Sequence, residues 1–177
     1  MFAQGQPAAQ DSAGVMTPWE IAPVLDEIGA HAGRLKTVLD QVDVKAWVAK
    51  GASETYLSQW RSSAVQAQAL ADGAKVLARN PERLSPGLEL FFRMRAVDTM
   101  VGSLAAGMRK YQKPADGDQL AALVAEIAPD EERYERYLVG LAAGMEQQLA
   151  VMDKEAQRCR VTMSAPAYSS DRNGKKK

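Results

Sequence analysis

The sequence predicts an all-α protein, an antiparallel up-down-up-down four-helix bundle with two short extra helices and disordered termini. Apolar residues recur at three- and four-residue spacing along four segments of roughly 25 to 30 residues. The links between these segments are short, so that consecutive helices are expected to run antiparallel. Aromatic residues make up only 6% of the chain, whereas strong helix formers are abundant, which favours helix over sheet.

The first long helix is predicted to begin at Thr17, because Pro18 follows at the first helical position and Glu20 completes a capping box. In that motif the Thr17 hydroxyl accepts from a free backbone N–H, and the Glu20 carboxylate binds the backbone of the capping residue. The expected buried stripe consists of Ile21, Leu25, Ile28, Ala32, Leu35, Leu39 and Val42. Gly29 and Gly33 form a GxxxG pattern, which indicates close approach of another helix.

A short connecting helix is expected over residues 43–50, closed by Gly51. The second long helix can start at Ser53, and Asn80 with Pro81 ends it. Its stripe is rich in small residues, which lets a neighbouring helix approach closely. The stripe consists of Tyr56, Trp60, Ser63, Ala67, Leu70, Ala74 and Leu77.

The third long helix is predicted to open at Ser85 with Pro86 and to stop at Pro114. Residues 116–118, Asp-Gly-Asp, indicate a turn. The stripe of this helix follows an unbroken heptad spacing, which is typical of helices packed side by side. It consists of Leu90, Met94, Val97, Val101, Leu104, Met108 and Tyr111.

A shorter amphipathic helix follows from Gln119, and a new helix is favoured at Pro129 because the acidic residues 130–132 suit a helix N-terminus. The stripe of this fourth long helix continues to about Arg160. It consists of Tyr134, Leu138, Leu141, Met145, Leu149 and Met152.

Three regions are therefore expected. Residues 1–16 form a disordered low-complexity segment, residues 17–161 the helical bundle domain, and residues 162–177 a disordered basic tail.

Charge is distributed in alternating blocks along a chain of zero formal net charge. Residues 44–115 carry eleven basic and five acidic side chains, whereas residues 116–160 carry five basic and ten acidic ones. Neighbouring helices of opposite charge explain this pattern more simply than a phosphate-binding surface, so nucleic-acid binding is not expected. No run of 18 apolar residues occurs, so no membrane span is expected.

The N-terminal residues leave the cellular location open. The chain as written lacks the charged and apolar regions of a signal peptide, which favours the cytoplasm. Met1 to Gln4 nevertheless resemble the last residues of an export signal. Export to the periplasm is therefore the alternative, if the true start lies upstream of Met1.

His31, the only histidine, is the first candidate for a binding residue, with Glu27 one turn before it. Two Glu-x-x-His motifs would be needed for a di-iron bundle, and this chain has neither, so a metal site is not predicted. A partly buried histidine bonded to Glu27 is the favoured interpretation. Haem ligation by His31 and a methionine is the weaker alternative, with the candidates Met94, Met100, Met108, Met145 and Met152.

Other polar candidates are few. Arg93 and Arg95 could hold an anion, but pairing with the acidic fourth helix is favoured. Cys159, the only cysteine, lies between Arg158 and Arg160, a setting that favours the thiolate. An unpaired thiol is expected there, with an intermolecular disulfide as the alternative in an exported protein.

No catalytic motif is present: the sequence contains no nucleophile elbow, no phosphate-binding glycine loop and no spaced acid/base pair. The favoured hypothesis is a non-enzymatic helical bundle without a cofactor, which either has a structural role or binds a protein partner or a second copy of itself. Trp19, Trp47 and Phe92 lie outside the minimal stripes and could form the contact patch. The alternative is a small-molecule- or cofactor-binding bundle of the sensor or cytochrome type, with a roomy polar interior around His31.

Overall fold

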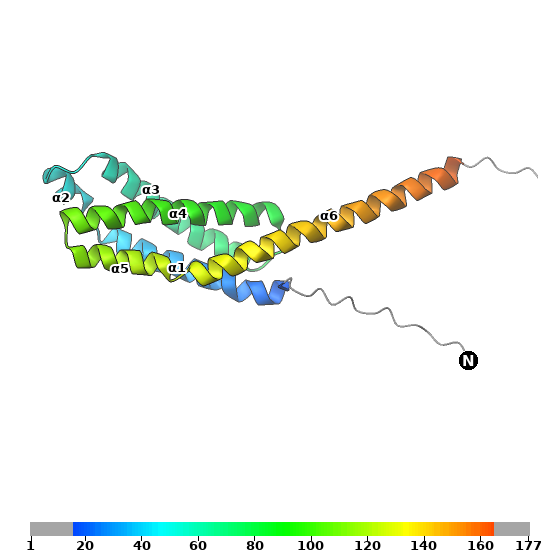
Figure 1. Cartoon of the computed structure of the whole chain (residues 1–177), viewed down its shortest axis with the longest axis horizontal. Helices are drawn as coiled ribbons and strands as arrows, with labels where there is room; N and C mark the ends of the chain where they lie inside the picture. The colour runs from blue at the N-terminus through cyan, green and yellow to red at the C-terminus, as the bar shows by residue number, and fades with distance from the viewer. Residues whose placement is uncertain (1–15, 165–177) are drawn as a thin grey trace, which may run out of the picture. The chain divides into compact units, whose positions relative to one another are not determined.

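The structure, a computed structural model, describes residues 16–164. Most of the two segments predicted to be disordered, 1–16 and 162–177, lies outside them, but residues 162–164 are described and belong to the last helix. Every regular element of the described part is a helix, which confirms the all-α class. The helices are α1 (Pro18–Asp40), α2 (Val44–Ala49), α3 (Thr55–Leu77), α4 (Leu84–Tyr111), α5 (Pro114–Ala125) and α6 (Ala128–Ser164) (Figure 1). The chain divides into two units, and the boundary between them falls within α6, after Leu141.

In the first unit, α3 packs against α1 and α4, and α5 packs against α4 and, less extensively, against α1 (Figure 1). The stripes predicted for α1, α3 and α4 supply most of the core. Ile21, Leu25, Leu35 and Leu39 of α1 are fully or almost fully buried. Burial of such apolar side chains, at about 25 cal/mol per Å², is the main source of stability in this unit.

The first turn of α1 is held by Glu20. Its carboxylate accepts a hydrogen bond of 2.7 Å from the backbone N–H of Thr17 and one of 2.6 Å from the Thr17 hydroxyl. These two hydrogen bonds lower the pKa of Glu20. The predicted start at Thr17 is therefore confirmed, although the hydroxyl donates to Glu20.

The glycine pattern of α1 marks close packing at one of its two positions. A Cβ atom at Gly29 would lie 3.4 Å from the carbonyl oxygen of Ala71 and from the Cβ of Ala74, both on α3. At Gly33 no atom lies within 4 Å of such a Cβ, so the prediction holds for Gly29 alone. The Nε1 of Trp60 on α3 also donates to the Leu39 carbonyl oxygen on α1, at 2.7 Å.

An aromatic cluster closes one end of the first unit. Trp47 of α2 lies with ring centroids 5.8 Å from Tyr56 and 6.4 Å from Tyr111. Gly107 makes room for it, because an added Cβ would lie 2.9 Å from Tyr56 Cε1 and 3.0 Å from Trp47 Cζ3. Trp47 is only 1% exposed, so its predicted place in a surface patch is wrong. The short helix carries it into the core, where it contacts residues distant in sequence.

Two predicted helix starts differ from the structure. Ser85 is not a cap, because α4 already begins at Leu84. Residues 116–118, predicted as a turn, are helical because α5 begins at Pro114, whose fixed φ suits a first helical position. Gly117 serves helix packing here: an added Cβ would lie 2.5 Å from the Ala105 carbonyl oxygen on α4.

The start of α6 belongs to the first unit and buries one face there. The predicted new start is confirmed, since α5 ends at Ala125 and α6 begins at Ala128, one residue before Pro129. The Tyr134 hydroxyl donates to the Gly87 carbonyl oxygen of α4 at 2.8 Å. A Cβ at Gly87 would lie 2.7 Å from Leu138 Cδ2. Gly87 therefore permits the close contact between α4 and the start of α6.

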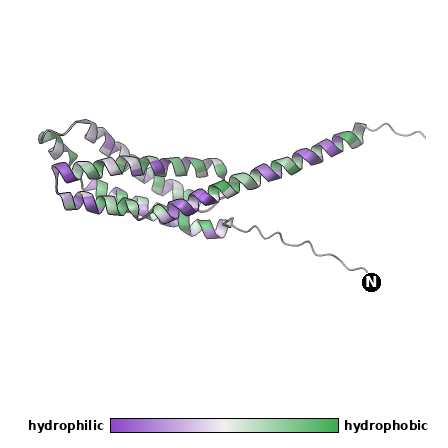
Figure 2. Cartoon of the chain, viewed as in Figure 1, coloured by the Kyte–Doolittle hydropathy of each residue, from purple (hydrophilic) through white to green (hydrophobic). Residues whose placement is uncertain are grey.

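The rest of α6, residues 142–164, is here called the distal segment. It continues to Ser164, and every residue from Glu146 to Met163 is exposed. Leu149 and Met152 are 65% and 63% exposed, so their prediction as core residues is wrong. Green and purple residues alternate along this segment (Figure 2), as expected for an amphipathic helix.

Candidate binding sites

His31 lies in the core of the first unit and is 2% exposed. Its Nδ1 is 3.4 Å from Nη2 of Arg34, which in turn lies 3.8 Å from the Glu126 carboxylate. The predicted bond to Glu27 is absent from the hydrogen bonds of the described residues, and Glu27 is exposed. The Nε2 of His31 is buried without a hydrogen-bond partner in the described part of the chain.

Burial, followed by the Arg34 charge, lowers the pKa of His31, and the carboxylates of Glu126, Glu27 and Asp130 oppose this effect only in part. The ring is therefore neutral near pH 7. Across residues 16–164 no group of three or more His, Cys, Asp or Glu side chains is placed to hold a metal ion. His31 thus acts as a packed core residue with one free ring nitrogen.

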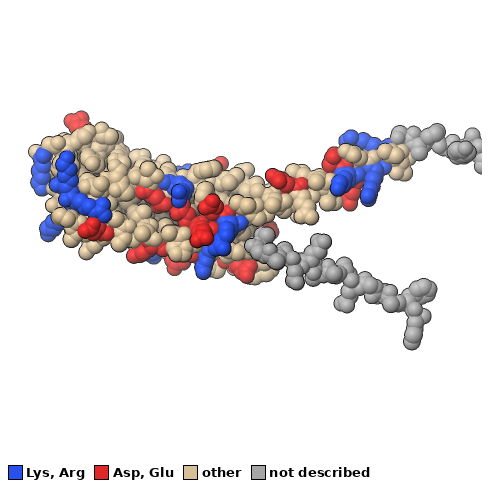
Figure 3. All heavy atoms as spheres, viewed as in Figure 1, with Lys and Arg blue, Asp and Glu red and all other residues tan. Residues whose placement is uncertain are grey.

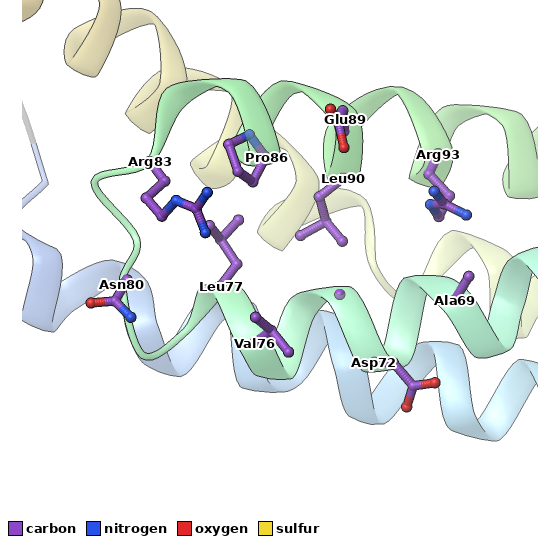
Figure 4. A pocket seen from close by; sticks show the side chains of 11 residues that line it. Ala69, Asp72, Val76, Leu77, Asn80, Arg83, Pro86, Glu89, Leu90 and Arg93 are labelled. Atoms are coloured by element: carbon purple, nitrogen blue, oxygen red, sulfur yellow. The ribbon is translucent and has the colours of Figure 1, made fainter.

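A groove of about 320 Å³ lies between the end of α3 and the start of α4 (Figure 4). Leu77 and Leu90 form its floor, and charged side chains surround it. The charged residues that line it are Asp72, Arg83, Glu89 and Arg93. Arg93 donates to the Gln66 side chain at 2.8 Å, so it is held within the fold rather than presented to an anion. Mixed charges around a shallow groove do not select one class of ligand.

A second groove, of about 300 Å³, lies where the ends of α1 and α4 meet the start of α5. The amides of Gln41, Gln112 and Gln119 line it, together with Asp116. Gln112 Nε2 donates to the Asp116 carboxylate at 2.6 Å, so two of these polar groups satisfy each other. The groove therefore offers few free polar groups to a ligand.

An acidic pair lies between α4 and the start of α6. Arg95 Nη1 donates to Glu131 Oε1 at 2.7 Å, which confirms the predicted pairing of Arg95 with the acidic helix. Burial and the Glu131 charge raise the pKa of the nearby Asp98 to about 6, although Arg95 lowers it. Sequence reasoning missed Asp98, because its neighbour Glu131 is 33 positions away in the chain.

Two of the three aromatic residues predicted for a contact patch are exposed. Trp19, in the first turn of α1, is 74% exposed, and Phe92 of α4 is 65% exposed. The Phe92 ring packs edge-on against Phe91, with centroids 5.8 Å apart. Isolated apolar residues of this kind occur on most protein surfaces, and the two do not by themselves define a site.

The distal segment carries the largest series of exposed apolar side chains among the described residues. They are Leu149, Val151, Met152, Val161 and Met163. Cys159 lies in the same helix and is free and exposed. Charged side chains gather toward the end of α6 (Figure 3), after a stretch with few charges. A long helix with an exposed apolar stripe is a surface suited to another helix.

In the described residues no helix is both long enough and apolar enough to cross a membrane. Comparison of the chain with models of known protein families, with curated proteins and with solved structures finds no match.

Proposed function

We propose that this chain is a non-enzymatic interaction protein that binds a protein partner through the distal segment of α6. The observation that carries the proposal is the exposed apolar stripe of residues 142–164, in which Leu149 and Met152 are more than three-fifths exposed. An isolated helix of this length is marginal in water and draws its stability from packing of an apolar face. A helix that keeps such a face uncovered is therefore well suited to pair with a partner.

In this proposal the first unit is an antiparallel four-helix bundle, with α5 and the start of α6 together forming the fourth helix. Three features support that arrangement. The helices pack in the cyclic order α1, α3, α4 and α5, and the link between α4 and α5 is only two residues long. Tyr134 ties the start of α6 to α4. The role of this bundle is structural, and its grooves are not the main binding surface.

The proposal is tested with full-length tagged protein in which one exposed apolar residue is replaced. Met152→Glu places a charge within the stripe, and Val151→Glu places the same charge at the neighbouring position outside it. We expect Met152→Glu to abolish binding between the tagged chain and its partner, and Val151→Glu to retain it, as measured by affinity capture and quantitative mass spectrometry. Equal capture by both variants would overturn the role of the distal segment.

A small-molecule-binding bundle is the second candidate, supported by the buried Nε2 of His31, which has no partner among the described residues. Native mass spectrometry of protein purified without denaturation tests it. A retained mass that disappears in His31→Phe would favour this function. A protein of the expected polypeptide mass, with binding that depends on Met152, would favour the interaction protein.

A further inference from the structure

The stripe of the distal segment follows a heptad repeat. Spacings of four and three residues alternate without interruption along Met145, Leu149, Met152, Ala156, Cys159 and Met163. A strict seven-residue repeat keeps one narrow seam on a helix and is the pattern of a left-handed two-stranded coiled coil. The seam contains no charged side chain, and its one small residue, Ala156, permits close approach of another helix.

Charged residues flank this seam on both sides. Glu155 borders one edge and Arg160 borders the other, five residues further on. In residues 16–164 neither side chain takes part in an ion pair, and the carboxylate of Asp153 already accepts from Gln157 at 2.9 Å. Two residues spaced in this way cannot pair within one helix, but they face each other across a parallel coiled coil.

The two orientations of a self-paired helix bring different charged residues to face each other. In a parallel pair, Glu155 of each copy meets Arg160 of the other, so two attractive contacts form and no like charges face each other. In an antiparallel pair aligned along the same seam, Glu146 meets Arg160, but Glu155 also meets Glu155, and Asp153 meets Asp153 of the other copy. Like charges across an interface are unfavourable, so the charge pattern selects the parallel orientation.

A membrane surface fits the segment less well. Helices that lie on membranes carry a polar face rich in lysine and arginine. Residues 142–164 contain three basic and three acidic side chains, which leaves no net positive charge.

We propose that the distal segment pairs in parallel with the distal segment of a second copy of this chain. This inference rests on the proposed function and names its partner. Met145, Met152 and Cys159 alternate with Leu149, Ala156 and Met163 along the interface, and Glu155 and Arg160 bind across it. The seam is shorter than three heptads, so the dimer dissociates reversibly.

The first test is sedimentation equilibrium of the full-length chain. The wild type is expected to be a dimer in equilibrium with monomer. Met152→Glu should raise the dissociation constant roughly a hundredfold, because it places two carboxylates in the seam. Val151→Glu, outside the seam, should leave the constant within about threefold of the wild type. A monomeric wild type, or equal effects of the two substitutions, would overturn the proposal, and circular dichroism verifies that each variant is folded.

The second test exchanges the flanking charges. Glu155→Arg and Arg160→Glu should each weaken the dimer about tenfold, because each replaces two attractive contacts by two repulsive ones. The double variant restores opposite charges across a parallel pair and should recover the wild-type constant. In an antiparallel pair it would leave repulsion in place. A double variant as weak as the single ones would therefore overturn the parallel arrangement.

The third test uses Cys159 and a short bismaleimide cross-linker. In a parallel dimer the two thiols share one layer and should be joined at high yield in the wild type. In the antiparallel register they are ten residues apart along the axis, about 15 Å, and the linker should not span them. Cross-linking in the wild type that persists in Val151→Glu and disappears in Met152→Glu supports the dimer. Failure to cross-link overturns it.

The outcomes separate the two proposals. A monomeric chain that captures a different protein through Met152 would leave the interaction function standing and remove self-pairing. A monomeric chain whose captured proteins do not depend on Met152 would remove both. Dissociation of an α6-mediated dimer only in Met152→Glu and the charge variants supports both.

Discussion

The two parts of α6 share the spacing of their apolar residues but differ in their surroundings. Between Ala128 and Leu141 the apolar stripe is buried, with Tyr134 and Leu138 packed against α4. Between Ala142 and Ser164 the stripe continues at the same spacing, but Leu149 and Met152 are exposed. The period of a helix thus identifies which residues share a face, and it does not tell whether that face lies inside the same chain.

The largest difference is expected from the same substitution in each part. Leu138→Ala removes a buried side chain and should lower the free energy of unfolding of the first unit by about 2–5 kcal/mol. Leu149→Ala, at an exposed position, should change it by less than about 0.5 kcal/mol. Urea unfolding followed by tryptophan fluorescence, with the protein dilute enough to be monomeric, measures both. Equal losses would mean that Leu149 is buried in the monomer.

The next effect concerns two buried tyrosines three residues apart in the anchored part. Tyr134→Phe leaves the Gly87 carbonyl without its donor and should cost about 1–2 kcal/mol. The Tyr137 hydroxyl is buried without a partner in the described residues, so Tyr137→Phe should be neutral or slightly stabilising. Thermal and urea denaturation of the two variants provides the comparison. A larger loss for Tyr137→Phe would contradict the hydrogen-bond assignment.

The third effect is a pH dependence confined to the first unit. Because the folded pKa of Asp98 is about 6 and the ordinary value is 3.8, the folded state binds the proton more tightly. The stabilising contribution of this proton is present below pH 3.8 and is lost as pH rises through about 6. Asp98→Asn should therefore stabilise the protein at pH 7.5, by about 1 kcal/mol after allowance for solvent screening. Asp26→Asn, at an exposed carboxylate that takes part in no ion pair of residues 16–164, is the control.

The smallest effect is expected at His31. Its folded pKa lies below the ordinary value of 6.5, so the unfolded chain takes up a proton first as the solution is acidified. The stabilising contribution of the neutral ring is present above pH 6.5 and declines as pH falls toward the folded pKa. His31→Phe should flatten the curve of unfolding free energy against pH in this window. An unchanged slope would show that the ring does not titrate differently on folding.

Sequence patterns predicted the helices well where the signal is local. The start of α1 at Thr17 and the new start beside Pro129 both follow from capping and proline rules. The prediction was wrong where tertiary contacts decide. Trp47 lies in a six-residue helix with too little sequence for a period, and its burial depends on Tyr56 and Tyr111.

The candidate binding residues were predictable only in part. Arg95 was expected to pair with the acidic helix, and the opposite charges of the two segments were sufficient to predict this ion pair. The hydrogen-bond partner of His31 is Arg34, three residues further along α1, whereas Glu27 at the preceding turn is exposed. Both neighbours have helical spacing, so only the positions of the surrounding helices distinguish them. The exposure of Leu149 and Met152 could not be predicted from the spacing of the apolar residues around them.

The positions of the three tryptophans allow the first unit to be followed by fluorescence separately from the distal segment. Trp19 is exposed, Trp47 is enclosed by two tyrosines, and the indole of Trp60 donates to a backbone carbonyl, so they differ in emission maximum and in access to quenchers. All three precede residue 61, and the distal segment contains none. Intrinsic fluorescence therefore reports on the first unit alone. A tryptophan introduced at Gln147 would give the distal segment its own optical signal.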